Sequence, residues 1–241
     1  MNGNGNGNGN GNGTIIRMAD VRKVYDTGKV KVEALKGIDL QVKKGEMVAI
    51  VGPSGSGKST LMNLIGCLDT ATSGAYELGG ENVAGVTRDH LAEIRNRRVG
   101  FVFQSFNLLP HISAQENVEM PMLFGGIAPK ERRERARELL SRVGLGDRFD
   151  HKPTELSGGQ MQRVAIARSL AMNPDIILAD EPTGNLDSSS GSDIMSIFTE
   201  LWKKGSTLVI ITHDPALAKR ASRVVEVRDG KITSDHAGEG M

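Results

Sequence analysis

The chain has 241 residues, a formal net charge of +1 and a single cysteine, Cys67. This length fits one compact α/β unit with an inserted subdomain better than several small domains. The near-zero net charge argues against a protein that binds nucleic acid by neutralising phosphates, so we expect no nucleic-acid partner. One cysteine forms no internal disulfide, and no apolar run reaches the about 18 residues of a membrane span. We therefore expect a protein of the reducing cytosol that reaches a membrane only through a partner.

The chain begins with a strict two-residue repeat of Asn and Gly at residues 2–13. This repeat contains no apolar side chain that could be buried to offset the loss of chain entropy on folding. We interpret residues 1–13 as a disordered tail, either native or added artificially, and expect one folded domain over residues 14–241.

Four short apolar runs predict the strands of a central sheet: residues 47–52, 99–103, 176–180 and 207–213. Continuous runs of this kind, without alternation of polar residues, are typical of parallel strands that are covered on both faces. Helical patterns at 58–68 and 158–173 lie between them, the second followed by Pro174. We expect an α/β fold with a mostly parallel sheet.

Two segments interrupt the alternation of strands and helices. Residues 73–83 contain Gly-Gly between two strand-like pieces, which predicts a hairpin in an antiparallel β annex. Residues 105–172 predict an inserted α-helical subdomain, in which one helix begins behind Pro129. The apolar positions of that helix repeat at helical spacing: Ala136, Leu139, Leu140 and Val143. Its charges alternate in sign, so we interpret them as a solvated face.

A glycine-rich motif connects the first predicted strand to the helix that follows it. It matches the pattern G-x-x-x-x-G-K-[ST] of a phosphate-binding P-loop, in the required strand–loop–helix context. Its residues are Gly52, Pro53, Ser54, Gly55, Ser56, Gly57, Lys58, Ser59 and Thr60. The backbone N–H groups and the helix start favour phosphate, Lys58 adds a full positive charge, and Ser59 offers a hydroxyl ligand to Mg²⁺.

Two acidic residues end the predicted strand at 176–180. Asp180 lies where ligands of open α/β sheets bind, at the carboxyl edge, and is expected to hold Mg²⁺ directly or through water. Glu181 is expected to orient or deprotonate the water that attacks the γ-phosphate of ATP. A strand-ending turn would explain these residues equally well if no P-loop were present.

The helix at 158–173 begins with the segment Leu-Ser-Gly-Gly-Gln at 156–160. Ser157 and Gln160 fit a capping box, in which each side chain bonds the other residue's backbone N–H. A cap needs neither Gly158 nor Gly159, although each glycine costs up to about 1 kcal/mol in a helix relative to alanine.

Four motifs follow one another along the chain: the P-loop, this segment, the strand ending at Asp180 and the segment Ile-Thr-His-Asp at 211–214. Their order resembles that in the ATPase domain of ABC transporters, and the resemblance covers residues 15–233. The resemblance implies that Tyr25 stacks on adenine, Gln104 senses the metal and the attacking water, and His213 contacts the γ-phosphate. It further implies that Asp187 links two subunits, and that Ser157, Gly158, Gly159 and Gln160 bind a nucleotide held by a second copy's P-loop. Taken alone, Tyr25 would be a half-buried sheet aromatic and His213 a capping or core residue.

Finer matches at 59–74, 95–122 and 184–191 are similar to the MacB/LolD group, whose ATPases drive macrolide export or lipoprotein release. This resemblance implies an ATP-dependent homodimer that drives a permease of MacB or LolC-LolE type from the cytoplasmic face of the bacterial inner membrane. The chain ends at Met241, so we expect either a free-standing ATPase or the ATPase part of a fused chain. An ATPase that regulates cell-envelope enzymes through a permease-like partner is the alternative. DNA-acting and ribosomal relatives are disfavoured, since long coiled coils and a second motif set are missing.

The helical subdomain presents six apolar residues that could receive a permease helix or form the subdomain's own core. They are Phe106, Leu108, Leu109, Met120, Met122 and Phe124. The sequence leaves both interpretations open.

Overall fold

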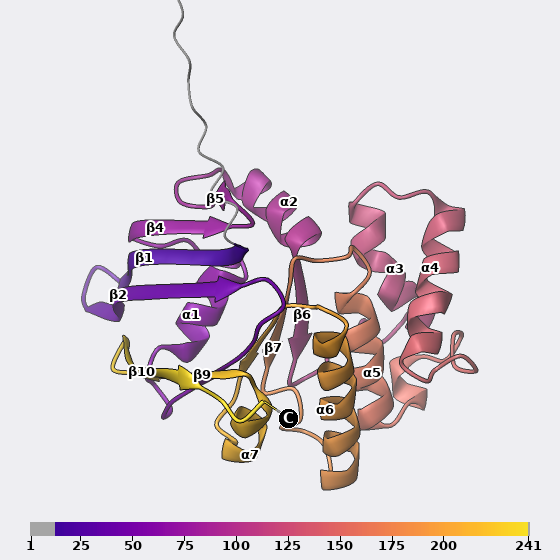
Figure 1. Ribbon diagram of the computed structural model, residues 1–241. Coiled ribbons are helices and arrows are strands. Elements are labelled where there is room, and N and C mark those ends of the chain that lie inside the picture. The colour runs from indigo at the N-terminus through magenta and orange to yellow at the C-terminus, as the bar shows by residue number, and fades with distance from the viewer. Residues whose placement is uncertain (1–12, 241) are drawn as a thin grey trace, which may run out of the picture.

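A computed structural model describes residues 13–240, in which a six-stranded sheet forms the centre of the molecule (Figure 1). The strand order is β10-β9-β3-β8-β7-β6. The strands are β3 (Met47–Val51), β6 (Val99–Phe103), β7 (Ile176–Asp180), β8 (Leu208–Ile211), β9 (Arg223–Arg228) and β10 (Lys231–Ala237). All four predicted strands are confirmed as neighbours in the parallel part of this sheet, with β9 beside β3 and antiparallel β10 at the edge.

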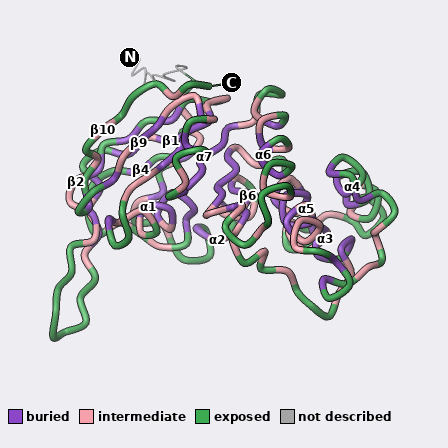
Figure 2. The backbone as a smooth tube through the Cα atoms, turned by 90° about the horizontal axis from the view of Figure 1, so that it is seen from below, coloured by how far each residue is buried: buried purple, intermediate pink, exposed green. Residues whose placement is uncertain are grey.

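The parallel strands are buried on both faces, which explains their continuous apolar sequences. In β3, Met47 and Ala49 belong to one buried hydrophobic cluster, while Val48 and Ile50 belong to the other. Strands β7 and β8 divide their side chains between the two clusters in the same alternating way. Figure 2 shows the buried residues concentrated in the interior of the molecule, with exposed residues along the outer helices and loops. The sheet thus separates two cores of similar size.

A second, antiparallel sheet has the order β2-β1-β4-β5. It consists of β1 (Thr14–Asp26), β2 (Lys31–Lys43), β4 (Ser73–Leu78) and β5 (Glu81–Asn82). The pairing of β4 with β5 confirms the predicted hairpin, and β1 begins at Thr14 as expected. The apolar-run criterion did not find β1 and β2, because their exposed positions carry charged residues and several bulges interrupt their register. The turn between them is exposed and projects from the body (Figure 2).

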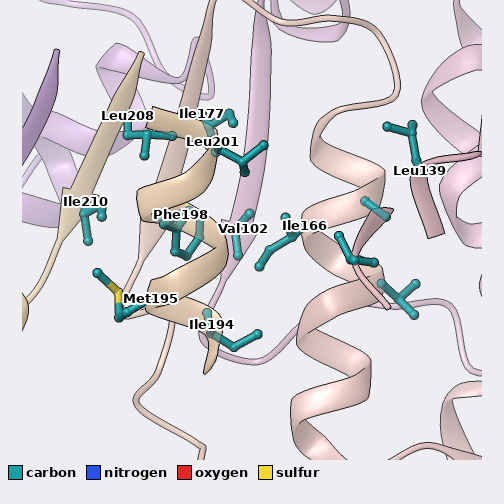
Figure 3. Close-up of a cluster of buried hydrophobic side chains, with 14 of the residues drawn as sticks. Val102, Leu139, Ile166, Ile177, Ile194, Met195, Phe198, Leu201, Leu208 and Ile210 are labelled. Atoms are coloured by element: carbon teal, nitrogen blue, oxygen red, sulfur yellow. The ribbon is translucent and has the colours of Figure 1, made fainter. Parts of the chain in front are cut away.

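Helices cover both faces of the central sheet. Helix α1 (Lys58–Ile65) packs in the cluster between the two sheets, whereas α5 (Gly158–Ser169) and α6 (Ser188–Lys203) cover the opposite face. Figure 3 shows Phe198 of α6 among the strand side chains Val102, Ile177 and Ile210. Helix α5 ends at Ser169, earlier than the predicted limit of residue 173, and a turn fills the interval before Pro174.

Helices α3 (Ala114–Phe124), α4 (Pro129–Arg142) and α5 pack against one another and form the helical subdomain, at the right of Figure 1. The predicted start at Pro129 and the burial of the apolar side of α4 are confirmed. A single 3₁₀ turn, η1 (Pro153–Glu155), precedes α5. Two further helices, α2 (Arg88–Arg98) and α7 (Pro215–Arg220), lie outside the subdomain.

The six apolar residues of the subdomain divide between core and surface. Met122 is fully buried and belongs to the core, and Leu108 packs against that core. Phe124 and Leu109 are exposed, and Met120 lines a surface groove. The core interpretation is therefore confirmed for Met122 and Leu108, while docking of a permease helix stays a prediction for the exposed residues.

No helix within residues 13–240 combines the length and the apolar character that a membrane crossing requires. Apart from Gly13, the predicted disordered tail lies outside the described residues.

The fully buried Phe198 of α6 provides a test of the core. Phe198→Ala removes a ring that packs between helix and sheet, so the free energy of unfolding should fall by about 3–5 kcal/mol. Phe124→Ala is the matched control, because the Phe124 side chain is exposed, and it should change stability by less than about 0.5 kcal/mol. Urea denaturation measures both; equal losses would contradict the assignment of Phe198 to the core.

Candidate active site

The P-loop follows β3 and leads into α1, and two of its glycines are required by close backbone contacts. Gly52 has φ = 153°, and a Cβ atom there would lie 2.1 Å from the carbonyl oxygen of Val227. Gly57 has φ = 105°, and its Cβ would lie 2.8 Å from the carbonyl oxygen of Ala34. Neither position accommodates a side chain without movement of the neighbouring backbone. The loop is thus held between β2 and the strand β9.

Two polar side chains of the P-loop are placed to receive an anion. Lys58 Nζ donates hydrogen bonds of 2.8 Å to the carbonyl oxygens of Gly52 and Pro53, so its ammonium group lies over the loop. Ser56 is buried, and its hydroxyl has no hydrogen-bond partner within the described residues. Ser59 and Thr60 lie in the first turn of α1, beside Lys58. The predicted P-loop residues therefore form one continuous cradle.

Asp180 is the last residue of β7 and lies next to Ile211 of β8. Partial burial and the neighbouring charge of Glu181 raise the pKa of the Asp180 carboxyl, while Lys58 lowers it. Lys58 and Asp180 thus interact electrostatically across the edge of the sheet. A cation bound to Asp180 would relieve the repulsion between the two carboxylates.

Glu181 is held by three donors from the end of β8. Its carboxylate accepts hydrogen bonds from Thr212 Oγ1 at 3.1 Å and from the His213 backbone N–H at 2.9 Å, and it contacts His213 Nδ1 at 2.6 Å. Its backbone is left-handed, with φ = 43°, and donates to Ile211 O. The structure therefore brings Glu181 and His213 together. Thr212, which the sequence analysis missed, completes the arrangement.

Gln104 follows β6 and is connected to the loop after Glu181. Its Nε2 donates to Asn185 Oδ1 at 3.0 Å, and Asn185 Nδ2 donates back to the Gln104 carbonyl at 3.2 Å. A Cβ atom at Gly184 would lie 2.7 Å from Gln104 Nε2. Asn185 lies within a motif used for the family resemblance, but no sequence signal indicated that it pairs with Gln104.

The capping box at the start of α5 is confirmed. Ser157 Oγ accepts from the Gln160 backbone N–H at 3.3 Å, and Gln160 Oε1 accepts from the Ser157 N–H at 2.9 Å. A Cβ at Gly158 would lie 3.3 Å from Leu186, and one at Gly159 would lie 3.1 Å from Ser190 Oγ. The two glycines thus allow α5 to approach α6 closely. A pocket of about 320 Å³ opens beside Ser157, Gly159 and Gln160.

Asp187 is the N-cap of α6. Its carboxylate accepts hydrogen bonds from the backbone and hydroxyl groups of Ser189 and Ser190. These bonds, led by that from the Ser189 side chain, hold the pKa of Asp187 well below its usual range. Within residues 13–240, no hydrogen bond joins Asp187 or the segment 157–160 to the P-loop.

Tyr25 is 39% exposed and its hydroxyl donates to Asp69 Oδ2 at 3.0 Å. It pairs with Val32 of β2, two residues before Ala34, whose carbonyl approaches Gly57 of the P-loop. The ring is therefore an accessible aromatic surface near the phosphate cradle and is not a core residue.

An α/β sheet with a P-loop after one central strand and carboxylates after another defines a P-loop nucleotide-binding protein. The comparison with protein families refines this class. Residues 35–184 match the family described as "ABC transporter". The chain belongs to that family, and it is an ATP-binding ATPase.

The curated relatives include free-standing and fused proteins. An uncharacterized ABC transporter ATP-binding protein of Thermotoga maritima is 54% identical over 90% of this chain and 93% of its own length. The uncharacterized ABC transporter ATP-binding protein YknY of Bacillus subtilis is 52% identical over 93% of this chain and 98% of its own length. The macrolide export ATP-binding/permease protein MacB of Hyphomonas neptunium is 53% identical over 92% of this chain. The chain spans only 34% of that MacB protein. These relatives confirm the predicted MacB-like group.

Solved structures confirm the predicted fold class. A dimeric structure of the ATP-binding cassette MJ0796 in a post-hydrolysis state, bound to ADP and Pi, superposes with a TM-score of 0.85 at 45% identity. The superposition covers 94% of this chain and 100% of the MJ0796 chain. A second dimeric structure of MJ0796, described as a bacterial ABC transporter cassette, has the same TM-score at 46% identity.

The contact between Glu181 and His213 predicts the protonation behaviour of the imidazole. The hydrogen bond and the negative charge of Glu181 raise the pKa of His213 above its ordinary value of 6.5. Glu181→Gln removes the charge and should bring this pKa back towards 6.5, as measured by NMR titration of the histidine ring. His213 should thus stay protonated to higher pH in the wild type, and any stabilisation from the pair is lost as the pH rises through the raised pKa. An unchanged titration curve in the variant would contradict the contact.

Proposed function

We propose that the chain is the motor subunit of an ABC transporter, and that two copies enclose ATP between the P-loop of one and the Ser157–Gln160 segment of the other. The observation that carries this proposal is the pocket of about 320 Å³ beside Ser157, Gly159 and Gln160, whose lining within residues 13–240 contains no residue of the P-loop. The dimeric state of the similar cassette MJ0796 supports it. Such a two-fold interface uses the same surface of both copies.

In the proposed site the triphosphate lies along residues 52–60, where Lys58 exchanges its two carbonyl partners for phosphate oxygens. Tyr25 stacks on the adenine. The residues that would hold Mg²⁺ are Ser59, Asp180 and Gln104, whose oxygen donors suit that ion. Bound Mg²⁺ would neutralise charge on the β- and γ-phosphates. The raised pKa of Asp180 fits this assignment, because burial and the charge of Glu181 disfavour its ionised form, which a bound cation would stabilise.

Glu181 acts as the general base in this proposal. It accepts a proton from the water whose oxygen attacks the γ-phosphorus, and ADP departs with the electrons of the broken P–O bond. In the structure the Glu181 carboxylate is engaged by Thr212 and His213. When the γ-phosphate arrives, the His213 side chain moves to contact it, and the carboxylate becomes available to the water, which Gln104 also orients.

The opposite copy completes the site. The N-terminus of α5 directs backbone N–H groups of Gly158 and Gly159 to the γ-phosphate, where the helix dipole favours negative charge. Ser157 and Gln160 frame this end of the helix through their capping box. Asp187 follows Leu186, whose side chain lies beside Gly158 of α5, and in this proposal Asp187 links the two subunits.

A groove of about 790 Å³ supports a membrane permease as the partner. The groove lies between the sheet and the helical subdomain. We place this subdomain at residues 105–172 of a nucleotide-binding domain that spans residues 14–241. Its apolar lining includes Phe101, Phe103, Met120 and Phe124. We place a permease of MacB or LolC-LolE type in this groove. The chain would then lie at the cytoplasmic face of the inner membrane. The MacB relative, described as ATP-binding and permease in one protein, supports this partner.

Glu181→Gln tests the assignment of the base. The variant retains the P-loop and should bind ATP normally, but hydrolysis should fall by at least about 100-fold, since general-base catalysis contributes factors of this size. ATP-bound dimers should therefore accumulate, as measured by light scattering after size exclusion with ATP and Mg²⁺. A variant that stays monomeric at saturating ATP and Mg²⁺ would count against Glu181 as the base.

Gly158→Asp tests the arrangement across two copies. The new carboxylate repels the γ-phosphate that the partner holds, so hydrolysis should be lost while the monomer binds ATP with unchanged affinity. Lys58→Ala is the matched comparison and should lose ATP affinity in the monomer itself. Calorimetric titration of ATP separates the two variants; equal loss of affinity in both would show that residue 158 serves the same chain's P-loop.

A further inference from the structure

The side chain of Asp69 connects two residues of β1 close to the proposed adenine site. Its Oδ1 accepts a hydrogen bond of 2.6 Å from Lys23 Nζ, and its Oδ2 accepts one of 3.0 Å from the Tyr25 hydroxyl. Lys23 is only 9% exposed and also donates to the carbonyl of Thr70 at 2.8 Å. Each oxygen of the carboxylate thus has its own side-chain donor from β1, and Oδ1 also accepts from the Thr70 backbone N–H at 2.7 Å.

The segment around Asp69 is itself fixed against β1. Thr72 accepts from the Val24 backbone N–H at 2.9 Å through its hydroxyl, and its own N–H donates to the Arg22 carbonyl at 2.9 Å. This segment follows α1, which begins with Lys58 of the P-loop. One short stretch of chain therefore runs from the phosphate cradle to the residue that holds the Tyr25 hydroxyl.

The Lys23 ammonium also restricts the use of the aromatic ring. Its Nζ lies 4.9 Å from the centroid of the Tyr25 ring, at cation–π distance, and so occupies one face. With the hydroxyl tied to Asp69, the ring cannot rotate freely about its bond to the chain. The opposite face is the one left for a planar ligand.

We propose that Asp69 is a positioning residue for the nucleotide base, which fixes the Tyr25 ring between Lys23 on one face and a purine on the other. The inference rests on the proposed role of Tyr25 and extends it to two residues that do not touch the base. Preorganisation of the ring contributes affinity because the entropy of ordering Tyr25 is already lost in the free protein.

The charge of Asp69 suits this role at neutral pH. Partial burial raises the pKa of its carboxyl, but hydrogen bonds from Lys23, the Thr70 N–H and Tyr25 outweigh burial, so that the pKa lies below its usual value. The carboxylate is therefore ionised and accepts both side-chain hydrogen bonds.

A ligand without a base separates this role from a merely structural one. Inorganic tripolyphosphate shares the phosphate cradle with ATP but has nothing to stack on Tyr25. Asp69→Ala in the full chain should weaken ATP binding by about 3- to 10-fold, the loss expected for a hydrogen-bonded contact. The affinity of the variant for tripolyphosphate should stay within about twofold of the wild-type affinity. Calorimetry with each ligand gives the ratio of the two affinities, and Asp150→Ala, which removes an exposed carboxylate elsewhere, should leave both affinities unchanged.

Tyr25 variants complete the experiment. Tyr25→Phe removes the hydroxyl but leaves the ring and the Lys23–Asp69 pair. It should therefore reduce the ratio of ATP affinity to tripolyphosphate affinity less than Asp69→Ala does. The double variant should have a ratio no lower than that of Asp69→Ala alone. Tyr25→Phe also serves as the test if Asp69→Ala fails to fold: no change in the ratio would then overturn the inference.

Three outcomes decide between the proposals. Equal weakening of ATP and tripolyphosphate by Asp69→Ala would overturn the inference and make Asp69 a structural residue. If Tyr25→Leu lowers the ratio and Asp69→Ala does not, the inference fails while the role of Tyr25 stands. If Tyr25→Leu itself leaves the ratio unchanged, the proposed stacking role fails and the inference with it.

Discussion

The parallel pairing of β3, β8, β7 and β6 is the constraint on which the proposed site depends. Burial on both faces leaves no polar position within these strands, so polar side chains appear only where the strands end. All four carboxyl ends meet at one edge of the sheet, which places the P-loop, Thr212, Asp180 and Gln104 together. The contacts of Glu181 with Thr212 and His213 exist because adjacent strands end at the same level.

Much of this arrangement was predictable from the sequence, since it depends on local patterns. Apolar runs locate the parallel strands, and the spacing of glycines and Lys58 locates the phosphate cradle. The antiparallel strands β1 and β2 were not predicted, because exposed charged positions and bulges remove the continuous apolar signal. Long-range pairs were equally hidden: Gln104 and Asn185 are 81 residues apart, and only tertiary packing brings them together.

The glycines at the start of α5 show how two requirements converge on one motif. The capping box explains Ser157 and Gln160, but close packing explains the glycines, since side chains there would press on Leu186 and Ser190. In the proposed dimer, the same lack of side chains would leave the helix N-terminus open to a ligand from another copy. Packing and the proposed ligand access would then favour the same residue type at these two positions.

Helix α5 joins this motif to the carboxyl edge of the central sheet through side chains further along it. Gln162 is fully buried and donates to the carbonyl of Pro182 at 2.6 Å, directly after Glu181. Near the end of the helix, Arg168 donates to the carbonyls of Phe106 and Asn107, two left-handed residues that follow Gln104. Burial lowers the pKa of Arg168, which has no carboxylate partner within residues 13–240, so these carbonyls are its main compensation. A partner that shifts the helical subdomain through the neighbouring groove would therefore move the Ser157 end of α5 and the Gln104 loop together, because one helix holds both.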